Sequence, residues 1–192
     1  MLRGLGVSEE AVGAPIRSSL EVVELGRTPE GWPAYCDRIA FESDWIVVMN
    51  RVKPHTAFKS DIESGLNKMM TVGLGKHRGA ENVHVIGLGK GVVPIARVIR
   101  AQAPIGVGIA IVENSEDETY DFRIVPPGEF EATDRECLVL ANKLLPRLPF
   151  DDLDILVVRE MGKNISGTGM DSNIIGIGRP IGGSHKPDIT RL

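Results

Sequence analysis

Three side chains within residues 50–90, those of His55, Lys68 and His84, are of types that carry out catalysis. His55 is expected in a loop between lysines, and nearby positive charges lower the proton affinity of an imidazole, which favours a neutral, base-competent form at pH 7. Lys68 is followed by two methionines, and loss of solvation beside apolar residues makes a lysine amine a better nucleophile. His84 lies in an apolar run, where a neutral imidazole is a common metal ligand. The stretch therefore predicts proton transfer, nucleophilic attack or metal binding.

Each of these residues also has an explanation that involves no chemistry. His55 fits an exposed loop histidine, and Lys68 fits a surface lysine whose aliphatic stem covers apolar groups. His84 fits a core histidine with a hydrogen-bond partner. Singly, none of them establishes a site. Their combination in one short segment favours chemistry.

The element expected to position His55 is the apolar run at residues 45–49, WIVVM, which predicts a buried parallel strand. Ligands bind beyond the carboxyl ends of such strands in α/β sheets, so the loop Lys53-Pro54-His55 lies where a site is expected. Upstream, residues 20–25 and 33–39 predict a hairpin around a Pro-Glu-Gly turn.

Lys68 is predicted to lie on a helix over residues 62–72, because four apolar side chains recur there on one helical face. Three glycines between residues 73 and 79 are expected to end this helix in a loop. Residues 82–87, which include His84, are predicted to form a second buried strand.

That strand is expected to run into the turn Gly87-Leu88-Gly89-Lys90-Gly91, ahead of a helix with apolar spacing from residue 92 to 102. The start of a helix after a strand favours a phosphate or carboxylate, whereas the same residues also fit a plain tight turn. The dinucleotide fingerprint is incomplete, because Val92 occupies the place of its third glycine. Both interpretations stay open from the sequence.

The second half of the chain continues the α/β pattern. Strands are expected at residues 105–114, 120–126 and 151–160, and an amphipathic helix at 128–148. The sequence thus predicts an α/β fold of two small units with mostly parallel sheets, Rossmann-like, over residues 1–100 and 101–192.

Composition excludes several classes of protein. The net charge of −4 comes without a basic stripe, which argues against nucleic acid as a partner. No apolar run approaches the ~18 residues that would predict a membrane span. Cys36 and Cys137 match no metal-ligand spacing and are expected to be reduced. We therefore expect a cytoplasmic protein without a membrane partner.

The spacing of these motifs resembles the site of the nickel-dependent lactate racemase family (LarA-like hydroxyacid racemases and epimerases). A Pro-His loop is represented by Pro54-His55, and a glycine-containing segment ending in lysine by Ser64-Gly65-Leu66-Asn67-Lys68. His84 follows sixteen residues after that lysine. Upstream, LGRTPEGWPAY is similar to a strand pair of the family, and GTGMDSN resembles a family loop near the substrate. The chain looks like a middle portion of such a protein.

The resemblance implies an isomerase that inverts the hydroxyl-bearing carbon of a lactate-like 2-hydroxy acid by hydride transfer. It implies that Lys68 carries a nickel-pincer nucleotide, that His84 ligates the nickel and that His55 is a catalytic acid/base. Gly87 and Gly89 are expected beside the cofactor. Candidates for the substrate carboxylate are Lys76, Arg78 and Lys163. Enzymes that make the cofactor are expected partners, and a second copy of the chain is a further candidate.

Two other functions remain open from the sequence. Lys68 could work without nickel, through a Schiff base or simple acid/base chemistry on a keto acid. The chain could instead be a non-catalytic module that binds an anion or phosphate at the turn of residues 87–91.

Overall fold

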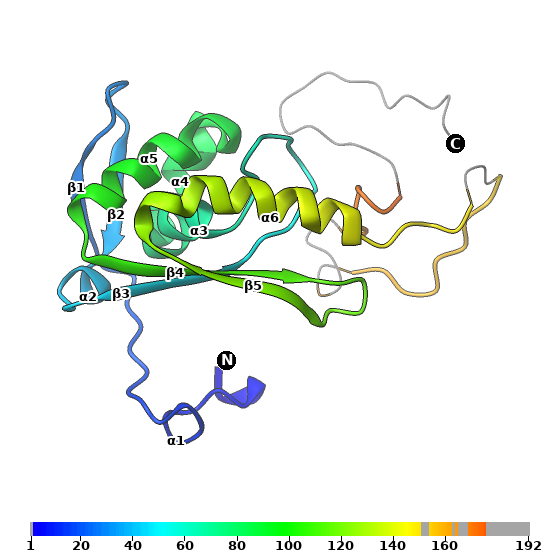
Figure 1. The fold of residues 1–192 in the computed structure, drawn as a ribbon, viewed down its shortest axis with the longest axis horizontal. Coiled ribbons are helices and arrows are strands. Elements are labelled where there is room, and N and C mark those ends of the chain that lie inside the picture. Colours follow the sequence, from blue (N-terminus) through cyan, green and yellow to red (C-terminus); the bar gives the residue numbers. More distant parts are fainter. Residues whose placement is uncertain (1, 151–153, 163, 165–168, 176–192) are drawn as a thin grey trace.

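The computed structural model describes residues 2–150, 154–162, 164 and 169–175, and it shows an α/β protein (Figure 1). Two small sheets and a group of helices form its body, and the first residues extend away from that body. In chain order the described elements are η1 (Leu2–Leu5), α1 (Glu9–Val12), β1 (Val22–Arg27), β2 (Pro33–Asp37), α2 (Arg38–Phe41), β3 (Ile46–Arg51), α3 (Leu66–Lys68), η2 (Met69–Leu74), α4 (Lys76–Ile86), α5 (Leu88–Gln102), β4 (Ile105–Glu113), β5 (Thr119–Val125), η3 (Pro127–Glu129) and α6 (Phe130–Leu144).

The larger sheet has the order β3-β4-β5. β3 pairs in parallel with β4, from Ile46 opposite Ile105 to Arg51 opposite Ile111, and β4 pairs antiparallel with β5. The expected α/β class is confirmed. Of the described strand pairs only β3–β4 is parallel, whereas the sequence predicted mostly parallel sheets. The boundary expected near residue 100 falls in the last turn of α5, and the larger sheet takes strands from both sides of it. The expected hairpin is confirmed as β1 and β2, which pair antiparallel.

One face of the larger sheet forms the core with α3, α5 and α6 (Figure 1). Phe130 and Leu66 are fully buried there and pack over β4. A Cβ on Gly108 would lie 2.5 Å from the Phe130 ring and 2.7 Å from a Leu66 methyl group. The missing side chain at Gly108 therefore lets α3 and α6 approach the sheet closely, because real Cβ atoms do not tolerate such contacts.

The opposite face of the same sheet is exposed. Trp45, Val47 and Met49 are 74%, 58% and 55% exposed. On β5, Phe122 and Ile124 are 61% and 63% exposed. The prediction of a strand buried on both faces is therefore wrong for β3, whose burial alternates between buried and exposed residues. The cause is that the helices pack on one side of the sheet only.

The helix that carries Lys68 differs from the sequence prediction at both ends. It begins at Leu66 instead of Ile62, and it continues through the glycines that were expected to end it. η2 is a π-helical turn, in which Gly75 N–H donates to the Met70 carbonyl at 3.2 Å. A Cβ on Gly75 or Gly79 would lie 2.1 or 2.4 Å from the Thr71 carbonyl oxygen. These glycines therefore accommodate the wide turn.

Residues 82–86 are helical and Gly87 caps them, so the strand predicted at 82–87 is wrong. They belong to α4, with Val83 fully buried and Val85 85% exposed. A short apolar run fits a strand or a helix equally well, and only its packing decides. The turn expected at residues 87–91 is reduced to Gly87, which joins α4 to α5, and residues 88–91 are the first turn of α5. Gly87 has φ 98°, a conformation that side-chain-bearing residues rarely adopt.

The strand predicted at residues 151–160 is also absent from its described part. Residues 154–160 form no strand, and Ile155 and Val157 are 80% and 86% exposed. The other expected elements of the second half are confirmed as β4, β5 and α6. The sheet that frames the site therefore consists of three strands in the described residues.

Candidate functional site

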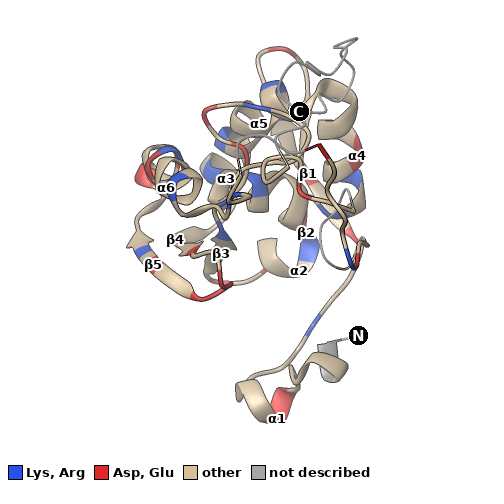
Figure 2. Ribbon diagram, turned by 90° about the vertical axis from the view of Figure 1, so that its right-hand side faces the viewer, with Lys and Arg blue, Asp and Glu red and all other residues tan. Residues whose placement is uncertain are grey.

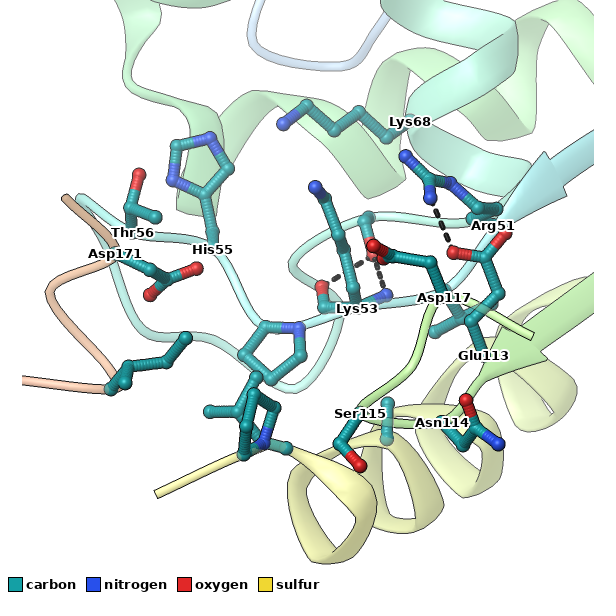
Figure 3. A pocket seen from close by; sticks show the side chains of 17 residues that line it. Arg51, Lys53, His55, Thr56, Lys68, Glu113, Asn114, Ser115, Asp117 and Asp171 are labelled. Carbon is teal, nitrogen blue, oxygen red and sulfur yellow. Dashed lines mark hydrogen bonds and ion pairs between the residues drawn. The ribbon is translucent and has the colours of Figure 1, made fainter. Parts of the chain in front are cut away.

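A cleft of about 550 Å³ lies beyond the carboxyl end of β3 (Figure 3). Its walls come from the loop after β3, the turn between β4 and β5, the end of α6 and the segment of residues 171–174. This is the place that the strand order predicts for a ligand site in an α/β protein. The lining residues are Arg51, Val52, Lys53, Pro54, His55, Thr56, Ser64, Lys68, Glu113, Asn114, Ser115, Asp117, Ala141, Leu145, Pro146, Asp171 and Ile174.

The loop that carries His55 is held by the buried carboxylate of Glu63. Its oxygens accept hydrogen bonds from the backbone N–H of His55 at 2.7 Å and of Ser60 at 3.1 Å. The His55 Nδ1 accepts a third bond from the Ala57 N–H at 3.1 Å, and its ring lies 4.5 Å from that of Phe58. Because Nδ1 is an acceptor, the neutral ring carries its proton on Nε2. No local pattern in the sequence indicates that Glu63 holds this loop.

The imidazole of His55 is neutral at pH 7. Burial lowers its pKa to about 4, with further electrostatic contributions from Lys68, His84, Lys53 and Lys59 in that order. The sequence pointed to neighbouring cations as the cause of a lowered proton affinity. The structure adds burial as the larger cause, because a charged imidazole loses solvation in the wall of the cleft.

Lys68 enters the cleft from α3, whose start is capped by Asp134 of α6. The Asp134 carboxylate is fully buried and accepts hydrogen bonds from the N–H groups of Leu66 and Asn67, each at 2.9 Å, and from the Asn67 side chain at 2.7 Å. Gly65 precedes this cap with φ 88° and ψ −151°, a conformation open essentially to glycine alone. The position of Lys68 therefore depends on a residue 66 places further along the chain, which local sequence patterns could not indicate.

The amine of Lys68 is poised for nucleophilic chemistry. Burial lowers its pKa, the charge of Lys53 lowers it further, and Glu63 acts in the opposite direction. Its Nζ lies 6.0 Å from the centre of the Phe58 ring, and it makes no ion pair with any described residue. A lowered pKa enlarges the neutral fraction of an amine, which is the form that attacks carbon.

His84 lies on the exposed side of α4 and does not line the cleft. Its Nδ1 lies 2.5 Å from the Ala80 carbonyl oxygen, which can only accept, so Nδ1 carries the proton and the Nε2 lone pair is left available. A metal-binding histidine commonly makes this second bond to a carbonyl.

The other residues suggested by the resemblance are distributed unevenly around this site. Gly89 borders the loop, since a Cβ there would lie 3.7 Å from the Phe58 ring, and Gly87 precedes it at the helix–helix turn. Lys76 forms an ion pair with Asp37 at 2.6 Å, and Arg78 lies over the Tyr35 ring. Neither cation lines the cleft. Lys163 lies outside the described residues.

The segment expected to resemble a family loop near the substrate reaches the cleft in its described part. Asp171 and Ile174 line it, and the Ser172 hydroxyl donates to the Thr56 carbonyl. The Asn173 side chain donates to the His55 carbonyl at 3.2 Å. This segment therefore packs against the loop of His55, although more than a hundred residues separate the two in sequence.

A scan against protein-family models finds no match for the chain, and a search of curated proteins finds none either.

The described residues contain no group of three or more His, Cys, Asp or Glu side chains that could hold a metal ion. No helix in the same part of the chain has the length and apolar character needed to cross a membrane. In the view of Figure 2 acidic and basic residues are interspersed over the helices.

Proposed function

We propose that the protein is a racemase or epimerase of a 2-hydroxy acid that works with a nickel-pincer nucleotide attached to Lys68. The observation that carries this proposal is the convergence of the Lys68 amine and the neutral His55 in one cleft at the carboxyl end of β3. The resemblance of the motif spacing supplies the reaction class. The cleft volume of about 550 Å³ lies in the range typical of small-molecule sites.

Three groups support this cofactor, although His84 does not line the cleft that Lys68 enters. Lys68 offers an amine without an ion-pair partner among the described residues, which suits a covalent link to a carboxylate-derived group. His84 offers the free Nε2 that a nickel ligand needs, with its Nδ1 held by a carbonyl. Gly89 lies at the start of α5 next to Phe58, and backbone N–H groups at the start of a helix favour a phosphate.

When bound, the cofactor would supply a hydride acceptor and donor. The chain's own residues would orient the substrate and handle its protons. With its proton on Nε2, His55 would donate a hydrogen bond to the oxygen on the reacting carbon, which favours the planar keto form of that carbon. To take up the hydroxyl proton at Nε2, His55 would have to adopt its other tautomer and release the Ala57 N–H. We propose that this loop changes its hydrogen bonding during turnover.

Intact-protein and peptide mass spectrometry test the proposal directly. The chain is co-expressed with the enzymes that make the cofactor, and we expect an added mass on the peptide that contains Lys68, together with bound nickel. Lys68→Arg should abolish the added mass, whereas Lys76→Arg, at a lysine paired with Asp37 away from the cleft, should retain it. An unmodified Lys68 without nickel would refute the proposed cofactor.

A second candidate function rests on the lowered pKa of Lys68 itself. An amine of this kind also forms a Schiff base with a keto acid without any metal. Borohydride reduction in the presence of pyruvate distinguishes the two functions, because it would add the mass of a reduced pyruvyl group to Lys68 only in the Schiff-base case. Absence of this adduct, at pyruvate concentrations that saturate the site, would exclude the second candidate.

A further inference from the structure

We propose that Lys53 binds the carboxylate of the ligand that occupies this cleft. This inference rests on the proposed function for the identity of the substrate, a 2-hydroxy acid. It assigns the anion-binding role to Lys53. The resemblance had instead suggested Lys76 and Arg78 for this role. Three observations support it: the position of Lys53, the partners of the other cations, and the lack of an ion pair at the amines of Lys53 and Lys68 among the described residues.

Lys53 is the second residue after β3, and its backbone is fixed in place. The Ser64 hydroxyl lies 2.6 Å from both the N–H and the carbonyl of Lys53, so it accepts from one and donates to the other. Figure 3 shows the side chain of Lys53 extending from this anchored backbone toward Lys68 and His55. The lysine therefore projects into the cleft from a rigid base.

The other cations near the cleft are engaged elsewhere. Arg51 is paired with Glu113, and Lys59 contacts Glu63 and Asn173. Lys76 is paired with Asp37 and lies outside the cleft. By contrast, the amine of Lys53 has no ion-pair partner among the described residues, and the cleft-lining Asp117 and Asp171 form no ion pair with it.

The charges at this point of the cleft favour an anion. Lys53 and Lys68 both contribute positive charge, and each lies close enough to lower the pKa of His55, while Lys53 also lowers the pKa of Lys68. Glu63 acts on Lys68 in the opposite direction, but neither lysine forms an ion pair with a described residue, so a bound anion would stabilise both positive charges. Once Lys68 is used for covalent attachment of a cofactor, Lys53 remains as the free cation beside His55. A carboxylate held there would place the adjacent hydroxyl-bearing carbon near the imidazole.

The test compares lactate with lactamide, its neutral amide, by NMR titration of the chain without cofactor. Wild-type protein should bind lactate more tightly than lactamide. Lys53→Met should weaken lactate binding about tenfold, as expected for the loss of a hydrogen bond between charged groups, and leave lactamide unchanged. Lys53→Arg should retain most of the preference. Lys76→Met serves as the matched control and should change neither affinity.

Several results would overturn the inference. These are a Lys53→Met variant with an unchanged preference for lactate, a wild-type protein without that preference, or a preference that depends on Lys76. Binding of inorganic phosphate that depends on Lys53, in the absence of lactate binding, would also overturn it and assign Lys53 to a phosphate group. If the preference follows Lys53 while mass spectrometry shows no cofactor on Lys68, the proposed function fails and the carboxylate site stands.

Discussion

The contact between Gly65 and Asp134 should be visible as a strong coupling between two mutations. A Cβ on Gly65 would lie 2.2 Å from the Asp134 Oδ1 and 2.6 Å from its carboxyl carbon. Gly65→Ala must therefore displace the carboxylate that caps the helix of Lys68. It also forces alanine into a conformation that only glycine adopts readily, with φ 88° and ψ −151°.

The expected magnitudes follow from these two causes. The backbone strain of Gly65→Ala costs about 2 kcal/mol. Loss of the buried cap, with three donors left without their acceptor, costs about 3 kcal/mol, and Asp134→Ala should cost that amount alone. Gly65→Ala should therefore lower the free energy of unfolding by about 5 kcal/mol in total. In the double variant the cap is lost only once, so the sum should again be about 5 kcal/mol instead of about 8, a coupling of about 3 kcal/mol.

Equilibrium urea unfolding of all four proteins, followed by far-UV circular dichroism, measures this coupling. An equal concentration of trimethylamine N-oxide in every sample keeps the weakest variant folded at low urea. Gly128→Ala is a matched control, because no atom lies within 4 Å of a Cβ placed there, and it should combine additively with Asp134→Ala. Additive effects for Gly65 and Asp134 would refute the contact and with it the proposed support of Lys68.

Burial shifts the pKa of His55 down to about 4 and that of Asp134 up to about 6. The His55 contribution to stability is therefore lost as pH falls below 6.5 toward 4, and the Asp134 contribution is lost as pH rises from 4 toward 6. Only the His55 shift remains in Asp134→Asn, so its free energy of unfolding, measured with urea, should rise between pH 4 and 6. Only the Asp134 shift remains in His55→Gln, so its free energy of unfolding should fall over the same range. Equal pH slopes in the two variants would contradict both shifts. Glu63→Gln should speed hydrogen exchange at the His55 amide at least tenfold, whereas the exposed Glu42→Gln should not. Gly79→Ala should destabilise the protein by more than about 1 kcal/mol in thermal unfolding, because its Cβ would meet the Thr71 carbonyl, and a neutral result would argue against the π-helical turn.

The sequence by itself determined the elements whose signals are local. Alternation and helical spacing predict the β1–β2 hairpin, β4, β5, α5 and α6, and the structure confirms each of them. The same local chemistry identified His55 and Lys68, because a strand exit and a lysine beside methionines are visible in the order of residues. The short segment of residues 82–87 does not decide its own structure, because a run of six residues with three apolar side chains fits either a strand or a helix. Its helical state depends on Val83 packing into the core.

Only the tertiary structure decided what supports the site and which lysine faces it. Asp134 caps the helix of Lys68 from 66 residues away, and no local pattern links a carboxylate on α6 to the start of α3. Lys53 and Lys76 are indistinguishable as cations in the sequence. Asp37 neutralises Lys76 outside the cleft, whereas Ser64 anchors the backbone of Lys53 at its edge. The physical reason is that charge pairing and capping depend on distance in space, which the chain sets only once its helices pack on the sheet.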